Sequence, residues 1–228
     1  MPEKYKQLLV RLLVVLMLFF SCSVWGTREV FSPGDLIQPS LILDAGHGGE
    51  DGGAVSLSGA KESDINLEIV LRMEQLLVLL GEQPLLLRSE DISIHDPQAQ
   101  TLREKKVSDL KNRAEAVNAH PDAALISIHQ NSYPESRYRG TQVFYSPTDG
   151  SQQLAQKLQR AVCKTLQKEN TRQEKQIPDS VYLMNHVSNR AVLVECGFLT
   201  NPEEEKLLQN PTYQRRLALV LATELTMG

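Results

Sequence analysis

The stretch that decides the fold reads LILDAGHGG and occupies residues 41–49. Its first three residues form a short apolar run, which predicts a buried strand, and the run ends in a polar loop rich in glycine. Loops that bind ligands in open α/β sheets lie at the carboxyl ends of the strands. We therefore expect His47 to stand at the carboxyl edge of a sheet.

The residues that follow predict an amphipathic helix. Apolar side chains recur at helical spacing from Ile65 to Leu80, with Ser63 or Asp64 as candidate N-caps and Gly81 as the stop. Strand and helix signals then keep alternating. Apolar runs predict strands at 85–87, 123–128, 140–145 and 191–194, and helical spacing predicts helices around 107–117 and 154–166. This alternation is typical of a single α/β domain.

The last predicted helix opens with a strong start signal. Asn201 is the expected N-cap, Pro202 stands at the first helical position, and three glutamates fill the first turn. We expect this helical stretch to continue past Pro211 towards Leu225.

The N-terminus differs in character from the rest of the chain. Lys4, Lys6 and Arg11 precede or interrupt an apolar run over 12–20, a pattern typical of an export signal. We expect residues 1–26 to be a signal peptide or signal anchor, residues 27–40 a linker, and residues 41–228 the folded domain. Retention as an anchor and removal by cleavage both fit this segment. Either outcome predicts an extracytoplasmic domain, held at the bacterial membrane or secreted.

Composition narrows the classes of function. The net charge of −4 and the absence of a basic stripe argue against nucleic-acid binding. A chain of 228 residues with 41% apolar content can bury a core without help, so a bound metal would serve function. Cys22, Cys163 and Cys196 show no metal-type or framework spacing, and we interpret all three as non-disulfide.

Three predicted strand ends deliver reactive side chains to one edge of the sheet: His47, His129 and Glu195. Two neutral imidazoles and one carboxylate form a common catalytic zinc shell, with a fourth position for water. The spacing alone leaves the identity of the carboxylate open. The candidates are Glu62, Asp44, Asp51 and Glu195.

Four blocks occur in a specific order along the chain, namely DAGHGG at 44–49, KESD at 61–64, SIHQN at 127–131 and LVECGFLTNP at 193–202. Together they resemble the catalytic domain of an N-acetylmuramoyl-L-alanine amidase, over about residues 41–228. The resemblance implies that His47, Glu62 and His129 bind one Zn²⁺ and that Glu195 is the catalytic carboxylate. It also implies a twisted, mostly parallel sheet flanked by helices on both faces, and peptidoglycan as the substrate.

The sequence departs from the family pattern at three places: the family usually has proline where Ala45 and Arg190 stand and alanine where Gln130 stands. The segments RGTQVFY at 139–145 and NTR at 170–172 make the chain similar to the spore-cortex branch of the family. Members of that branch strip stem peptides before muramic lactam forms, so sporulation, germination and an activating protein partner are part of this expectation.

Several side chains keep alternative interpretations. Asp44 could orient His47, and Arg113 could face either substrate or solvent. We expect His95, His120 and His186 to be ordinary surface or core histidines, and Cys196 to be a small buried apolar residue. Two other functions remain open: a zinc peptidase that cuts within the stem peptide, and a non-catalytic wall-binding or partner-binding module, which predicts a missing ligand or catalytic glutamate.

Overall fold

The structure is a computed structural model that describes residues 39–227. The predicted signal segment at 1–26 and all but the last two residues of the predicted linker lie outside the described residues, so these assignments remain predictions. Within residues 39–227, no helix has the length and apolar character needed to cross a membrane.

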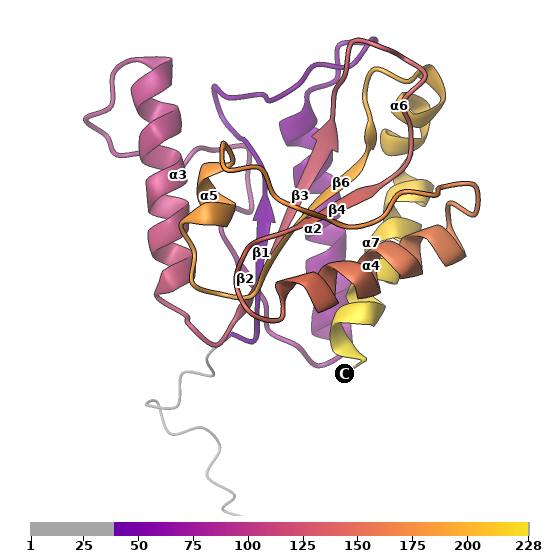
Figure 1. Ribbon diagram of the computed structural model, residues 1–228. Coiled ribbons are helices and arrows are strands. Elements are labelled where there is room, and N and C mark those ends of the chain that lie inside the picture. The colour runs from indigo at the N-terminus through magenta and orange to yellow at the C-terminus, as the bar shows by residue number, and fades with distance from the viewer. Residues whose placement is uncertain (1–38, 228) are drawn as a thin grey trace, which may run out of the picture. The chain divides into compact units, whose positions relative to one another are not determined.

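A six-stranded sheet with the order β2-β1-β3-β6-β4-β5 forms the centre of the domain (Figure 1). Its strands are β1 (Leu41–Ala45), β2 (Leu85–Leu86), β3 (Ala124–Asn131), β4 (Gln142–Tyr145), β5 (Lys175–Gln176) and β6 (Ala191–Phe198). Strands β2, β1, β3 and β6 are mutually parallel, whereas β4 pairs antiparallel to β6. The carboxyl ends of β1, β3 and β6 therefore meet at one edge.

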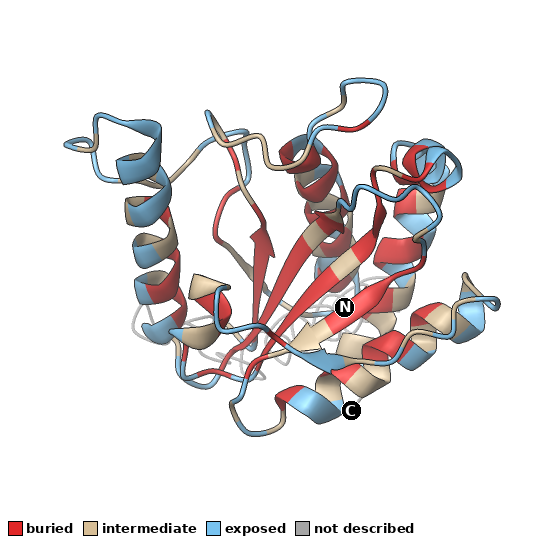
Figure 2. Ribbon diagram, turned by 45° about the horizontal axis from the view of Figure 1, so that its top comes forward, coloured by how far each residue is buried: buried red, intermediate tan, exposed pale blue. Residues whose placement is uncertain are grey.

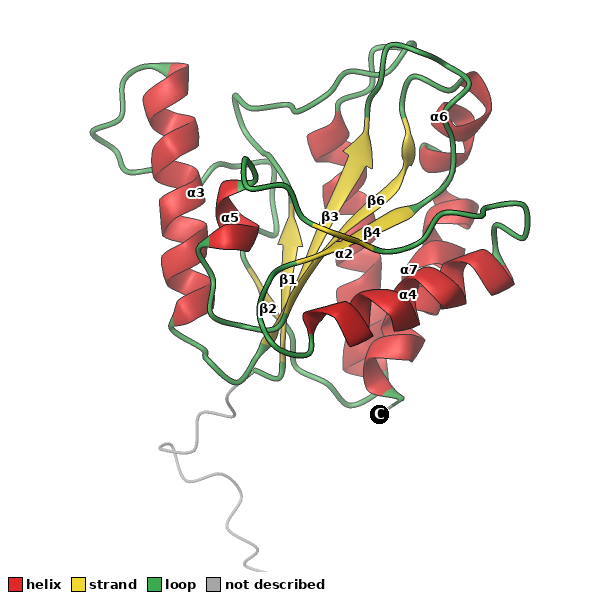
Figure 3. Cartoon of the chain, in the orientation of Figure 1, coloured by secondary structure: helices red, strands yellow, loops and turns green. Residues whose placement is uncertain are grey.

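Helices cover both faces of the sheet (Figure 3). One face packs against α2 (Glu62–Leu79), α4 (Ser151–Thr165), α6 (Pro202–Leu208) and α7 (Pro211–Thr226). The other face packs against α3 (Leu102–Asn118) and the short α5 (Tyr182–Asn185). The expected α/β domain with a twisted, mostly parallel sheet between two helical layers is confirmed.

The pleat of the central strands decides which side chains reach which layer. These strands are buried along most of their length (Figure 2). Ile42, Leu125 and Leu193 pack in the layer of α3 and α5. Because side chains alternate with a period of two, the residues two positions later, Asp44 and Glu195 among them, face that same layer. Helices α3 and α5 therefore lie on the side of the sheet that Asp44 and Glu195 face.

The predicted N-caps of the first helix are wrong. Helix α2 begins at Glu62, after an extended Lys61 whose side chain makes no cap, and Ser63 lies inside the first turn. Backbone carbonyls of the preceding loop perform the capping instead, since Ala54 accepts from the Glu62 N–H and Gly52 from the Ser63 N–H. At the other end, Gly81 follows the helix at φ 93°. The predicted stop there is confirmed.

The predicted continuous helix at the C-terminus is also wrong. Asn201 caps α6 and Pro202 follows it as expected, but the chain breaks after Leu208 and starts α7 at Pro211. The Asn210 side chain accepts hydrogen bonds from the first free N–H groups of α7. Proline cannot donate an N–H to the turn before it, so it begins a new helix more readily than it continues one.

Candidate active site

His47, Glu62 and His129 meet at the carboxyl edge of the sheet. One nitrogen or carboxylate oxygen from each lies within 4.8 Å of the others. His129 Nδ1 is 3.0 Å from Glu62 Oε1, and His47 Nε2 is 3.4 Å from Glu62 Oε2. Among the four carboxylates that the sequence left open, Glu62 is the one that the fold places between the two imidazoles.

The start of α2 and the end of β3 hold the Glu62 carboxylate in place. The side chain is 4% exposed and accepts from the N–H groups of Ala54 at 2.9 Å and Gln130 at 3.1 Å. Burial by itself raises the pKa of this carboxyl. The hydrogen bonds and positive charge of His129 and His47 outweigh that effect and hold the pKa well below its usual range. Glu62 is therefore a carboxylate at neutral pH.

His47 lies on a strained loop with a second acidic neighbour. Among the described residues, His47 is the one non-glycine residue with a positive φ angle, 63°, a conformation that side chains rarely adopt. Its Nδ1 lies 3.0 Å from Asp51 Oδ2. Burial lowers the pKa of His47, but hydrogen bonds with Asp51 and Glu62 prevail and raise it to about 9. The suggestion that Asp44 orients His47 is thus wrong, and Asp51 occupies that position.

Two glycines let the backbone approach this cluster. A Cβ atom on Gly46 would lie 2.2 Å from the His129 ring, and a Cβ on Gly53 would lie 2.6 Å from Glu62 Oε2. Any side chain at either position would collide with the cluster. These glycines are therefore a requirement of the site's geometry.

Arg113 does not face solvent, which rules out one of the two sequence-based alternatives. It is 2% exposed and forms ion pairs with Asp44 and Asp109. Its guanidinium also donates to the carbonyls of Ala45 and His47. Both carboxylate oxygens of Asp44 have partners in this network, since Oδ1 pairs with Arg113 and Oδ2 accepts from the Ser127 hydroxyl. Arg113 therefore clamps the loop that carries His47.

Sequence reasoning missed a second arginine with a similar role. Arg88, which follows the predicted strand at 85–87, is buried and donates to the carbonyls of Ala45, Gly46 and Ser63. Its position was the available signal, because a charged residue that continues a buried strand needs partners.

Glu195 is the neighbour of His129 in the register of β3 and β6. Its Oε2 has no exposed surface and no hydrogen-bond partner. Burial is the main cause that raises the pKa of this carboxyl, to about 7. The negative charge of Glu62 also raises this pKa, whereas the positive charges of His129 and His47 lower it. Glu195 can therefore bind and release a proton near neutral pH.

The remaining candidates lie away from the cluster. His95 contacts Ser93, and His186 stacks on Tyr182, with ring centroids 3.8 Å apart. Cys163 and Cys196 are free, as predicted, whereas Cys22 lies outside the described residues. Burial raises the pKa of the Cys196 thiol, which argues against a nucleophile there.

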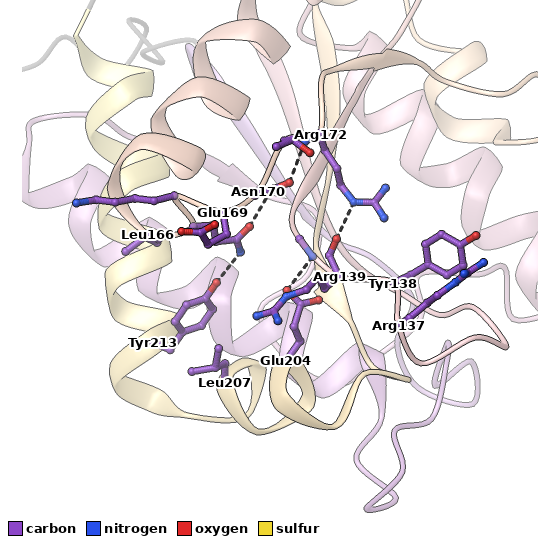
Figure 4. Close-up of a pocket in the computed structure, with 14 residues that line it drawn as sticks. Arg137, Tyr138, Arg139, Leu166, Glu169, Asn170, Arg172, Glu204, Leu207 and Tyr213 are labelled. Atoms are coloured by element: carbon purple, nitrogen blue, oxygen red, sulfur yellow. Dashed lines mark hydrogen bonds between the residues drawn. The ribbon is translucent and has the colours of Figure 1, made fainter.

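Of two hollows in the domain, one adjoins the cluster of His47, Glu62 and His129 and the other does not. One of about 270 Å³ is lined by His47 and His129 together with residues of α3 and α5. Another of about 440 Å³ lies between the segment 137–140, the loop 166–172 and the last two helices (Figure 4). None of the four predicted site residues lines the second hollow. The first is the one that adjoins the candidate active site.

The fold and the cluster define the class of protein: an α/β domain with a histidine–glutamate–histidine group at the carboxyl edge of a parallel sheet. The chain belongs to the N-acetylmuramoyl-L-alanine amidase family, an enzyme family whose model matches residues 41–226. The resemblance inferred from the four motif blocks is confirmed.

Relatives of this family resemble the chain over most of its length. A germination-specific N-acetylmuramoyl-L-alanine amidase of Bacillus subtilis strain 168 is 34% identical over 224 residues, covering 96% of this chain and 92% of the relative. The solved CwlD amidase of Clostridioides difficile, in complex with the GerS lipoprotein, superposes with a TM-score of 0.77 at 36% identity, covering 81% of this chain and 95% of that one. An N-acetylmuramoyl-L-alanine amidase from Clostridium difficile 630 gives a TM-score of 0.70 at 28% identity, covering 82% and 94%.

Proposed function

We propose that the chain is a zinc-dependent hydrolase of peptidoglycan. It cleaves the amide between the lactyl group of N-acetylmuramic acid and the L-alanine of the stem peptide. The observation that carries this proposal is the meeting of His47, Glu62 and His129 within 4.8 Å, beside Glu195, in a chain of the amidase family.

The donor set suits a single zinc ion held by His47, Glu62 and His129. Two imidazoles and a carboxylate leave one tetrahedral position for water or substrate. Ligand atoms that bind zinc at about 2.0–2.2 Å lie about 3.4 Å from one another in a tetrahedron. The two histidine nitrogens contact different Glu62 oxygens, at 3.0 and 3.4 Å. One donor atom from each of the three residues lies within 4.8 Å of the others, so a single bound ion would draw the three groups closer together. Asp51 supports His47 from its other nitrogen, as acidic partners of metal-binding histidines commonly do.

Glu195 is the proposed catalytic carboxylate. When bound, zinc supplies a Lewis acid that polarises the scissile carbonyl and makes water more acidic. Glu195 takes a proton from the attacking water and transfers it to the departing amine of L-alanine. In the metal-free chain, burial raises the pKa of Glu195 to about 7, so this position can hold a proton on the carboxyl group. The clamp formed by Arg113 and Arg88 keeps the His47 loop in position while the proton moves.

The relatives suggest where this chemistry takes place. Similarity to a germination-specific amidase supports action on spore-cortex peptidoglycan, where removal of the stem precedes formation of muramic lactam. The solved complex of CwlD with a lipoprotein supports an activating protein partner for this chain as well. A wall substrate requires an extracytoplasmic enzyme, held at the outer face of the membrane or secreted through its N-terminal segment.

Mass spectrometry of purified peptidoglycan, incubated with the zinc-loaded full chain, tests this function. We expect free stem peptides that begin with L-alanine, and we expect none from Glu195→Gln. Glu115→Gln, an exposed glutamate on α3, is the matched control and should retain activity.

Two other outcomes would contradict the proposal. Single amino acids or shortened stems would indicate a peptidase that cuts within the stem. Intact peptidoglycan with zinc bound, and without a partner that restores activity, would indicate a non-catalytic module.

A further inference from the structure

The hollow beside the candidate active site is lined by apolar side chains and by charged ones, including the carboxylates of Asp44, Asp51 and Asp109. The layer of α3 and α5 and the sheet beneath contribute apolar side chains, namely Leu110, Val181, Leu183, Met184 and Leu193. His47 and His129 also line it. At about 270 Å³ it holds a few amino-acid side chains and is too small for a run of sugar rings.

One exposed ammonium group lines this hollow. Helix α3 places three of its residues on the face that lies against the sheet, at spacings of three and four: Lys106, Asp109 and Arg113. Arg113 is buried in its ion pairs, but the Lys106 side chain is 46% exposed. Lys106 Nζ lies 3.1 Å from Asp51 Oδ2, which leaves two of its three donors for a ligand.

If the chain cleaves peptidoglycan, as proposed above, the covalent structure of that substrate decides which part of it enters this hollow. A glycan strand continues on both sides of each muramic acid, so it needs open surface in two directions. The stem peptide leaves the scissile amide in one direction only, and its first residue carries a small methyl group. The second residue is a γ-linked glutamate whose α-carboxyl group is either free or amidated.

We propose that Lys106 is a specificity residue that binds the free α-carboxylate of the second stem residue. The apolar walls receive the L-alanine methyl group and the aliphatic part of the glutamate. The carboxylate, one residue from the scissile amide, then meets the exposed ammonium group of Lys106. Chains with Lys106 accordingly prefer free-acid stems to amidated ones.

Two soluble glycan substrates that differ only in this carboxyl group test the proposal. For the zinc-loaded full chain, we expect kcat/KM for the free-acid stem to exceed that for the amidated stem by about tenfold, the size of one charge-assisted hydrogen bond. In Lys106→Met the ratio should fall to about one. The matched control is Lys105→Met, because this neighbouring lysine pairs with Glu50 instead and does not line the hollow.

A second measurement needs no turnover. Calorimetric titration with the dipeptide L-alanyl-γ-D-glutamate and with its α-amide should show the same tenfold preference, and Lys106→Met should abolish it. If Lys106 only holds Asp51 in place, its loss will weaken both substrates equally and leave the preference intact, which overturns the proposal. If the parent chain releases no stems yet still prefers the acidic dipeptide, the proposed function fails while the role of Lys106 stands.

Discussion

Replacing Glu195 by glutamine should stabilise the metal-free chain at high pH. Folding raises the pKa of this carboxyl from 4.5 to about 7, so the folded chain holds the proton more tightly than the unfolded chain. Stability is therefore lost as pH rises from 4.5 through 7. At about 1.4 kcal/mol for each pH unit between the two values, ionisation costs at most about 3 kcal/mol. Glutamine cannot ionise and does not incur this cost.

Urea unfolding in the presence of a chelator, from pH 5 to pH 8.5, measures the difference in free energy of unfolding. We expect Glu195→Gln to exceed the parent by about 1 kcal/mol at pH 5 and by about 3 kcal/mol at pH 8. Glu115→Gln, at an exposed position, should show no such trend. A difference that stays flat with pH, or a less stable Glu195→Gln at pH 8, would refute the reasoning from burial.

Three further changes test the geometry of the site. Gly46→Ala should push the His129 ring aside, and metal analysis should find less than one zinc per chain although circular dichroism remains unchanged. Arg113→Met leaves two carboxylates buried without their partner and should cost about 3–5 kcal/mol in urea unfolding; a loss under about 1 kcal/mol would contradict the clamp. Asp51→Asn should weaken zinc binding about 10- to 100-fold in competition with a chelator, whereas the exposed Asp64→Asn should not.

The sequence alone predicted most of the elements in order, without β5 and α5, and three of the four proposed site residues as strand-end side chains. Apolar runs and helical spacing are local signals, and parallel strands bring their carboxyl ends to one edge. These two facts suffice to place His47, His129 and Glu195 together. The break before Pro211 was predictable in principle from the same local rules, because Asn210 repeats the start signal seen at Asn201.

Only the tertiary structure decided which acidic and basic groups contact the cluster. Spacing did not distinguish Glu62 from three other candidate carboxylates, and only the resemblance favoured it. The position of Glu62 depends on how α2 packs against the end of β3, which spacing does not reveal. Asp51 has the role expected of Asp44, since the path of the loop after β1 turns Asp51 towards His47. Arg113 proved to be a buried clamp. The contacts of Glu62 and Arg113 join residues far apart in the chain, and even the contact between His47 and Asp51 depends on the path of the loop. Their geometry arises from packing, which no local pattern of residues encodes.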